Sequence, residues 1–410
     1  MPLGIYISIP FCRTKCTYCN FASDVFSKSA YENYVQHLLE DIASSRALAA
    51  RLGCTSDENA DSIYLGGGTP SILNTAQLAR IFAAVRDQFT VVPGAEITVE
   101  CAPGTLTNPL LEALLGAGVN RVSLGVQSFV DRETQSVGRL HKRSIVLEEV
   151  ARLRHFGLNN INIDLIAGLP HQTAESWAFS LAETIALAVP HVSVYMLEVD
   201  EDSRLGRELI AGGARYHAHF VPDDAMTADF YTQACQTLNS AGISQYEISN
   251  FARRESESRH NLKYWTRQPY LGFGVDAHSM LPAATKSRAF SPAPTPKTSA
   301  HEAVRFATPD SLEAYMNGGP YTLTTVSTQA AIEESFFLGL RLTRGVDLDT
   351  IRREFSSELI AAFEPTIEEC REQNLLEIRE QNGIEDRGGR LCLTHRGRLL
   401  SNEVFTRFVT

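Results

Sequence analysis

Residues 5–21 read IYISIPFCRTKCTYCNF and hold the most informative pattern of the chain. Residues 5–9 predict a short β-strand. The loop after it carries Cys12, Cys16 and Cys19 in the spacing Cys-x3-Cys-x2-Cys. Three thiolates so close together can hold three irons of a [4Fe–4S] cube and leave the fourth iron open to a small chelating ligand. We therefore expect a [4Fe–4S] cluster on this loop.

Two other readings of the cysteines are zinc and reactive thiols. Zinc normally takes a fourth ligand nearby, and His37, the nearest histidine, is badly placed to supply it. Reactive thiols would need only the Cys-x2-Cys part of the pattern. The position directly after a first barrel strand favours the cluster, because a motif gains weight from its structural context.

Outward from this loop, predicted strands and helices alternate. Helical stripes lie near residues 31–42, 77–89, 109–117, 144–156 and 174–188, and strand signals lie at 62–65, 96–100, 121–125, 160–165 and 191–197. With the first strand, six strands alternate with five helices, which is typical of parallel strands joined by crossover helices. The expected fold class is α/β, a partial (β/α)6 barrel.

The chain has 410 residues, which exceeds the usual size of a single core, so we expect more than one domain. The predicted division is a core barrel over 1–240, an extension over 241–281, a Pro-rich linker or loop over 282–310 and a smaller C-terminal domain over 311–410. In the last domain, helices near 328–342, 348–354 and 358–373 precede a hairpin of 375–380 and 390–393 around a turn at 388–389. That order predicts a winged-helix-like domain.

Composition narrows the class of protein. Apolar residues make up 44%, and no apolar run approaches the ~20 residues of a spanning helix, so we expect a soluble cytoplasmic protein that is not an integral membrane protein. The net charge of −11 opposes nucleic acid as the main partner. Residues 329–410 are also net negative, with 11 Arg and no Lys against 15 Asp and Glu. Eight cysteines are too sparse for a secreted disulfide scaffold.

Special residues follow the predicted strands. Residues 66–69, Gly-Gly-Gly-Thr, follow the second strand, Glu100 ends the third, and Gln127 lies just beyond the fourth. Chemistry in β/α barrels belongs at the carboxyl ends of the strands, so these residues should meet the cysteine loop there. A phosphate-binding loop is the other interpretation of the glycines, but no Gly-Lys-Ser/Thr follows.

The cysteine spacing resembles the signature of the radical S-adenosylmethionine superfamily. With YLGGGTPS, ITVECAP, RVSLGVQSF, GRLH, IDLIAGLP, HNLKYW and YLGFGVDAHSM, the chain resembles the oxygen-independent coproporphyrinogen III oxidase family. The resemblance implies a [4Fe–4S] cluster whose open iron chelates S-adenosylmethionine. It also implies a first group of residues, Tyr6, Gly67 and Glu100, that contacts S-adenosylmethionine. A second group lies at a second site or on the substrate side and consists of Gly68, Thr69, Gln127, Arg139 and Asp164, and Tyr18 is a further cofactor-binding residue.

Two positions favour the haem chaperone branch of that family. Phe21 stands where the decarboxylating oxidases carry a fourth cysteine, and residues 260–265, HNLKYW, match the HNxxYW motif of the chaperone branch. The resemblance then implies haem binding at His260, Asn261, Tyr264 and Trp265, with His260 either an axial ligand or a residue that shapes the pocket and Asn261 a candidate partner for the second imidazole nitrogen. The alternative is that His260 and Trp265 only close the open side of the barrel. Ala102 and Asp276 depart from the usual Asn and Gly of the family.

As a function, the resemblance implies a protein that holds haem and delivers it to apo-haemoproteins, such as those of the respiratory chain at the membrane. The alternative is oxidative decarboxylation of coproporphyrinogen III through the adenosyl radical. A radical enzyme that acts on another substrate stays open as well. The sequence also leaves the oligomeric state open, a homodimer included.

Overall fold

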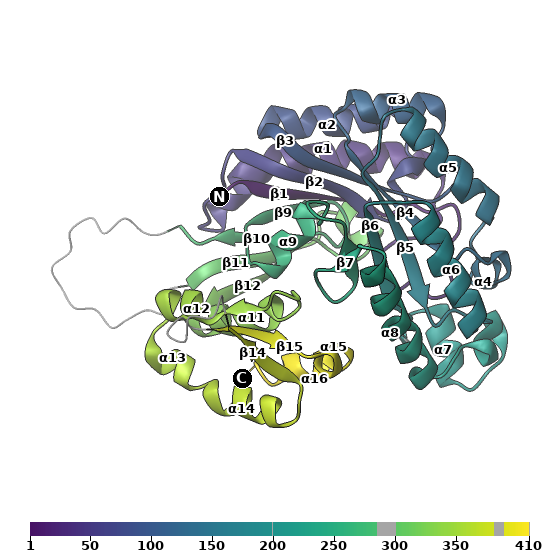
Figure 1. Ribbon diagram of the computed structural model, residues 1–410. Coiled ribbons are helices and arrows are strands. Elements are labelled where there is room, and N and C mark those ends of the chain that lie inside the picture. Colours follow the sequence, from purple (N-terminus) through teal and green to yellow (C-terminus); the bar gives the residue numbers. More distant parts are fainter. Residues whose placement is uncertain (199, 285–300, 381–388, 410) are drawn as a thin grey trace.

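The structure is a computed structural model that describes residues 1–198, 200–284, 301–380 and 389–409. One twelve-stranded sheet dominates it (Figure 1), in the order β12-β11-β10-β9-β1-β2-β3-β4-β5-β6-β8-β7. Its strands are β1 (Leu3–Ile9), β2 (Asn59–Gly67), β3 (Thr90–Cys101), β4 (Arg121–Gln127), β5 (Ile161–Ala167), β6 (His191–Met196), β7 (Ser244–Gln245), β8 (Asn250–Ala252), β9 (Tyr270–Phe273), β10 (His278–Pro282), β11 (His301–Ala307) and β12 (Thr322–Ser327).

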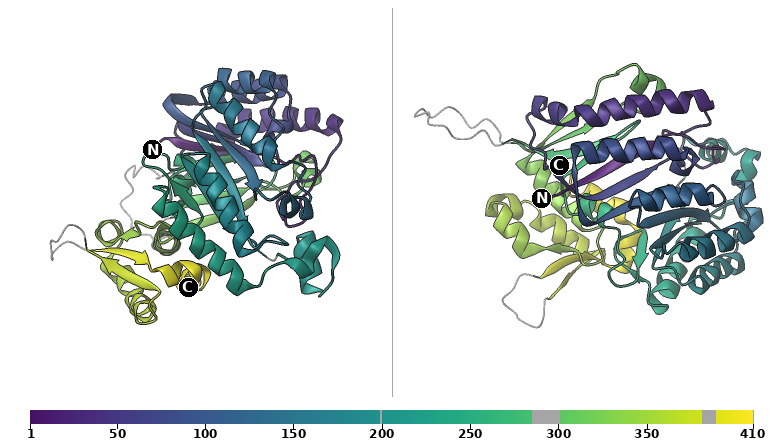
Figure 2. Two further views of the ribbon diagram at one scale, coloured as in Figure 1. Left: turned by 45° about the vertical axis from the view of Figure 1, so that its right-hand side comes forward. Right: turned by 90° about the horizontal axis from the view of Figure 1, so that it is seen from above.

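The predicted alternation of strands and helices is confirmed. Strands β1 to β6 pair in parallel and in chain order. They are joined by α1 (Lys28–Arg51), η1 (Pro70–Ile72), α2 (Thr75–Gln88), α3 (Asn108–Gly116), α4 (Asp131–Ser136), α5 (Arg143–His155) and α6 (Ala174–Ala186). The chain continues through α7 (Arg204–Ile210), η2 (Arg215–Phe220), α8 (Asp224–Ser240) and α9 (Arg259–Trp265). Seen from above, α1, α2 and α3 lie side by side across the sheet (Figure 2).

Apolar and polar residues alternate along the parallel strands, and this pattern gives the sheet two different faces. Ile5, Ile7 and Ile9 are buried in the same core as Val35 and Leu38 of α1, so this face packs against the helices. The intervening positions are polar and hydrogen-bond to one another across the other face, as described below. Since successive side chains on a strand point to opposite faces, the pattern makes one face a core and the other a polar interior.

The sheet extends beyond the predicted six strands at both edges. Strand β9 pairs in parallel with β1, whereas β10, β11 and β12 follow as an antiparallel ribbon, and β8 and β7 extend the other edge. The sequence assigns 301–307 to a linker or loop, but these residues form β11. Ala303, Val304 and Phe306 of this strand are buried, a signal hidden beside the Pro-rich segment. Residues 285–300 lie outside the described part of the chain.

The C-terminal residues form a smaller unit below the sheet (Figure 1). It contains a three-stranded sheet in the order β13-β15-β14. Its elements are α11 (Thr328–Gly339), β13 (Val346–Asp347), α12 (Leu348–Glu354), α13 (Ser357–Ala361), α14 (Glu364–Glu372), β14 (Leu376–Arg379), β15 (Arg390–Leu393), α15 (His395–Leu399) and α16 (Ser401–Thr406). Between β11 and β12, α10 (Leu312–Met316) packs instead against α1, where the ring of Tyr315 lies 5.6 Å from that of Tyr34.

The hairpin of β14 and β15 is confirmed, although residues 381–388, with half of the predicted Gly388–Gly389 turn, lie outside the described residues. The single helix predicted at 358–373 is wrong, because it forms two helices, α13 and α14. Pro365 sits in the first turn of α14, where its missing N–H costs nothing, whereas within a longer helix it would break the ladder.

One apolar core joins this unit to the large sheet. Tyr270 of β9, Met280 of β10 and Val326 of β12 pack in the same cluster as Phe336 and Phe408 of the C-terminal unit. The antiparallel ribbon thus serves as the base on which the unit is built. Within the described residues, no helix combines the length and the apolar character that crossing a bilayer requires.

The packing of α6 offers a test of the core. Trp177 is fully buried, and its Nε1 donates to the Phe230 carbonyl of α8 at 2.7 Å. We expect Trp177→Ala to lower the free energy of unfolding by about 3–5 kcal/mol, because it leaves a large cavity and removes a buried hydrogen bond. Phe179→Ala on the same helix, where the side chain is exposed, should cost about 1 kcal/mol or less. Urea unfolding of both variants measures this, and equal losses would contradict the assigned packing.

Candidate functional site

The cysteine loop follows β1 and is held from three directions. The backbone N–H of Cys12 donates to the Asp24 carbonyl at 3.0 Å, which closes the loop at its base. Within the loop, the Thr17 N–H donates to the Val137 carbonyl at 3.1 Å, and the Thr17 carbonyl accepts from the Leu205 N–H at 2.8 Å. The loop is therefore anchored between the segment after α4 and the start of α7.

The three thiols are half-buried on this loop and form no disulfide. Burial raises the pKa of both Cys12 and Cys19. In the described chain, no three His, Cys, Asp or Glu side chains already converge as they would around a bound metal ion. Three soft donors on one anchored loop nevertheless fit the donor set of a [4Fe–4S] cluster, and binding would deprotonate the thiols.

The glycine loop after β2 is hydrogen-bonded to the base of the cysteine loop. The N–H groups of Gly68 and Thr69 donate to the Ile9 and Phe11 carbonyls, each at 2.8 Å, and the Thr69 hydroxyl reaches Cys12 Sγ at 3.8 Å. A Cβ at Gly68 would lie 2.7 Å from the Phe11 carbonyl oxygen and 3.0 Å from Cys12 Sγ. Glycine is thus required here by close approach of the backbone, which fixes Cys12 relative to β2.

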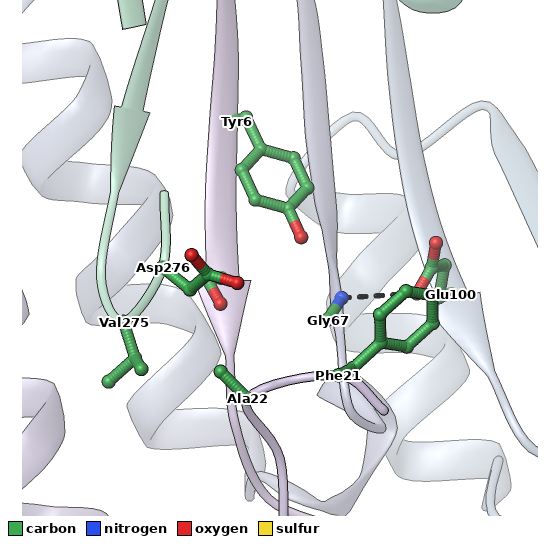
Figure 3. Close-up of a pocket in the computed structure, with 8 residues that line it drawn as sticks. Tyr6, Phe21, Ala22, Gly67, Glu100, Val275 and Asp276 are labelled. Carbon is green, nitrogen blue, oxygen red and sulfur yellow. Dashed lines mark hydrogen bonds between the residues drawn. The ribbon is translucent and has the colours of Figure 1, made fainter. Parts of the chain in front are cut away.

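A pocket of about 110 Å³ opens beside this loop, and its walls come from β1, β2, β3 and the turn after β9. Figure 3 shows the side chains of Tyr6, Glu100 and Asp276 around one space, with Phe21 and Ala22 on the loop at its lower end. Ser8, Gly67 and Val275 complete the lining. The pocket therefore brings together Tyr6, Gly67 and Glu100, three of the positions predicted to bind S-adenosylmethionine.

Glu100 is the central acceptor of this pocket. Its Oε1 accepts from the Tyr64 hydroxyl at 2.8 Å, and its Oε2 accepts from the Gly67 N–H at 3.2 Å. Burial raises the pKa of Glu100 to about 7, although these two hydrogen bonds act in the opposite direction. The carboxyl group can therefore exchange its proton near neutral pH, and ionised it would attract a cationic group of a ligand.

Asp276 adds a second carboxylate at the position where the sequence resemblance expects glycine. Its φ of 54° lies in the left-handed region that glycine adopts without cost. The backbone thus keeps the conformation expected for glycine while the side chain lines the pocket. This departure makes the pocket more acidic.

A second polar group surrounds Arg139. Its Nη2 donates to the Tyr18 hydroxyl of the cysteine loop at 2.9 Å. Arg139 and Gln127 lie close together beside Gly125, because a Cβ atom at that glycine would be within 3.4 Å of side-chain nitrogens of both residues. Arg139 Nε and Gln127 Oε1 are buried and have no hydrogen-bond partner among the described residues. Since buried polar atoms are rarely left unpaired, these two atoms fit a polar ligand beside the cysteine loop.

Asp164 lies on the neighbouring strand, in a network of short hydrogen bonds. Its carboxylate accepts from the Ser123 hydroxyl at 3.0 Å and from Asn162 Nδ2 at 2.7 Å. Burial raises the pKa of Asp164. Together with Gln127 and Arg139, it places the predicted second group of residues on the polar face of β4 and β5.

The HNLKYW segment forms most of α9 and lies away from the cysteine loop, against the amino ends of β2 and β3. His260 is 1% exposed, and its backbone N–H donates to Glu96 at 3.1 Å. Both ring nitrogens are engaged, Nδ1 with the Ser62 hydroxyl at 3.0 Å and Nε2 with the Tyr264 hydroxyl at 2.8 Å. The prediction that Asn261 partners His260 is therefore wrong, because on one helical turn Tyr264, four residues on, reaches the ring instead.

Burial lowers the pKa of His260 to about 3, so its imidazole stays neutral. Its ring stacks on Tyr64 with centroids 5.3 Å apart, and Tyr64 in turn donates to Glu100. Two other residues of the segment also contact neighbouring side chains. Lys263 pairs with Asp61 at 2.7 Å, and the guanidinium of Arg341 lies 4.2 Å above the Trp265 ring. The segment thus joins the polar interior to the C-terminal unit.

Several functional positions escaped prediction. Ser62, Tyr64, Ser123 and Asn162 contact the predicted residues but receive no role from the sequence, although Tyr64 and Ser123 lie within the motifs YLGGGTPS and RVSLGVQSF. For Tyr64, Ser123 and Asn162, the signal that could have found them is the alternation itself, because each occupies a polar position between buried aliphatic neighbours on a parallel strand.

Comparisons with known proteins agree with this arrangement. The family model of the radical SAM superfamily matches residues 6–182, and that of the HemN C-terminal domain matches residues 326–400. The chain is 33% identical to the heme chaperone HemW of Bacillus subtilis over 98% of both chains. It is 31% identical to the heme chaperone HemW of Lactococcus lactis over 100% of this chain and 97% of the relative.

Among solved structures, the chain resembles coproporphyrinogen III oxidase (HemN) from Escherichia coli, a radical SAM enzyme. The TM-score is 0.79 at 22% identity, with 100% of this chain and 90% of that chain covered. This likeness shows that the two proteins share a fold.

The contact of Gly68 with the cysteine loop predicts a specific loss of iron. In Gly68→Ala the new methyl group must displace the Phe11 carbonyl or Cys12, so we expect the anaerobically reconstituted variant to hold less than about half of the wild-type iron. Gly116→Ala is the matched control, since a Cβ there meets nothing within 4 Å. Iron and sulfide analysis gives the result, and full iron content in Gly68→Ala would show that the loops are not coupled.

Proposed function

Because the chain belongs to the haem chaperone HemW family, we propose that it binds haem together with a [4Fe–4S] cluster and S-adenosylmethionine and delivers the haem to apo-haemoproteins. Phe21 is the observation that carries this choice. It lines the pocket beside the cysteine loop, at the position where the decarboxylating oxidases resembled by the sequence have a fourth cysteine. The function rests on this substitution and on similarity over the full length to chaperones.

For the cofactors, we propose that Cys12, Cys16 and Cys19 hold the cluster. When bound, it supplies an open iron that can take the amino and carboxylate groups of S-adenosylmethionine. Tyr6, Gly67 and Glu100 would then surround this ligand. The Glu100 carboxylate can accept a hydrogen bond from the amino group, while Tyr64 and the Gly67 N–H hold it in place.

For the second group, we propose that Gly68, Thr69, Tyr18, Gln127, Arg139 and Asp164 line the side of the site facing a further ligand. The unpaired Arg139 Nε and Gln127 Oε1 support this role, because a polar ligand would satisfy both. Arg139 can pair with a carboxylate, and Asp164 can accept from a hydroxyl group.

For the HNLKYW segment, the contacts favour support of the haem site over direct ligation. Both nitrogens of His260 are already bonded, and Tyr264 and Trp265 pack against neighbouring side chains. Asn261 lies on the same helix, half-buried. We propose that these four residues shape the interior that ends at Glu100. Cytoplasmic location, recipients at the membrane and a homodimer stay predictions.

The shifted pKa of Glu100 gives a pH test of cofactor binding. Its ordinary value is 4.5 and its value here is about 7, so the ionised form that accepts hydrogen bonds is lost as the pH falls through 7. We expect the affinity for S-adenosylmethionine, measured calorimetrically on anaerobic protein, to fall roughly tenfold between pH 8 and pH 6. Glu100→Gln should bind more weakly at pH 8 and show little pH dependence. The same slope in both proteins would assign the titration to another group.

Chaperone and oxidase functions are separated by one pair of assays on the same anaerobic protein. We expect haemin titration to give a saturable absorbance change and the loaded protein to transfer haem to an apo-haemoprotein. Incubation with coproporphyrinogen III and S-adenosylmethionine should yield no protoporphyrinogen. Substantial turnover to protoporphyrinogen without haem binding would reverse the proposal.

A further inference from the structure

The carboxylate of Asp276 lines the cofactor pocket and has room for a ligand. It comes from the turn between β9 and β10, residues 274–277, and lies across the pocket from Glu100, below the ring of Tyr6 (Figure 3). Its Oδ1 lies 3.7 Å from Nε2 of His278, an exposed side chain. That distance exceeds a hydrogen bond, so both carboxylate oxygens can accept from a bound molecule.

The fold holds this turn in place through its backbone. The N–H groups of residues 274–277 donate, in chain order, to Asp41 Oδ2 at 3.3 Å, the Tyr34 hydroxyl at 3.2 Å, the Pro309 carbonyl at 2.8 Å and Thr308 Oγ1 at 2.8 Å. Asp276 itself has a φ of 54°, in the left-handed region, which Asp and Asn adopt more readily than most other residues with a side chain. Because the backbone is fixed by its neighbours, the carboxylate is directed at the pocket before any ligand binds.

We propose that Asp276 accepts a hydrogen bond from the 6-amino group of the adenine of S-adenosylmethionine, an assignment that rests on the proposed cofactor site. In that site the methionine part of the cofactor binds beside Gly67 and Glu100. The adenosyl part would then extend into the rest of the pocket, where the ring of Tyr6 offers an aromatic surface to the base. Asp276, on the opposite side from Glu100, would meet the far end of the ligand, where the base carries its amine.

The exposure of Asp276 favours this role over attraction of the sulfonium charge. Its side chain is 46% exposed, so water and salt screen a charge–charge attraction, whereas a hydrogen bond depends on direct contact. An ionised carboxylate accepts hydrogen bonds and donates none. It therefore favours a base whose six-position carries a donor, as in adenine, over one whose six-position carries an acceptor, as in guanine. Asp276 would thus contribute to the choice of base.

The test is calorimetric binding of two probes to the full-length, anaerobically reconstituted protein. The probes are S-adenosylhomocysteine and its analogue with purine in place of adenine, which lacks the 6-amino group. We expect the wild type to bind the purine analogue about tenfold more weakly, because one hydrogen bond to a charged acceptor is lost. Asp276→Gly should bind both probes equally, and Asp276→Asn, which keeps a neutral acceptor, should show an intermediate preference. Comparison of two ligands on two proteins isolates the contact between them.

Two controls separate this contact from a structural effect. Asp310→Asn makes the same charge change at an exposed residue that does not line the pocket, and it should keep the wild-type preference. Asp276→Gly should keep the wild-type iron content and melting temperature, because glycine adopts the left-handed conformation of the turn without strain.

Three results would overturn the assignment. The wild type could bind both probes equally. Asp276→Gly could keep the full wild-type preference for the adenine probe, which would assign the amine to another acceptor. Alternatively, Asp276→Gly could weaken binding of S-adenosylmethionine and leave both homocysteine probes unaffected, which would make the carboxylate a partner of the sulfonium charge. If the wild type holds its cluster but binds neither S-adenosylmethionine nor S-adenosylhomocysteine, the proposed cofactor site fails and the assignment fails with it, a result distinct from these three.

Discussion

The two faces of the parallel sheet differ in chemistry, and the rest of the structure depends on that difference. On β1, Ile5, Ile7 and Ile9 pack under the helices, while Tyr6 and Ser8 face a polar interior. Burial of the aliphatic face supplies most of the stabilisation, because apolar area removed from water is the dominant favourable term in folding. The polar face can then carry carboxylates, hydroxyls and imidazoles that hydrogen-bond to one another instead of filling a core.

The polar interior has two ends with different properties. At the carboxyl ends of the strands, the cysteine loop, the glycine loop and Glu100 meet around an open pocket. At the amino ends, α9 places His260 against Glu96, and the C-terminal unit contacts α9 through Arg341, which lies over the ring of Trp265. Tyr64 connects the two ends of the interior, since its ring stacks on His260 and its hydroxyl donates a hydrogen bond to Glu100.

Local patterns predicted most of the barrel but little of what lies beyond it. The six parallel strands followed from the alternation of predicted strands and helices. The positions of Glu100 and Gln127 followed from the rule that functional residues of β/α barrels lie at the carboxyl ends of the strands. The ribbon of β10 to β12 did not, because its pairing joins segments separated by the Pro-rich stretch, and long-range pairing leaves no periodic trace. One of the two partners of the His260 ring was missed for the same reason. Ser62 comes from a strand 198 residues earlier in the chain.

The central claim is that metal chemistry takes place at the carboxyl ends of the strands, and the location of iron tests it most directly. An iron-edge anomalous difference map from anaerobic crystals of the reconstituted, haemin-loaded protein would reveal every iron. We expect a cluster-sized peak within the loop of Cys12, Cys16 and Cys19. A cysteine loop without iron would contradict the claim.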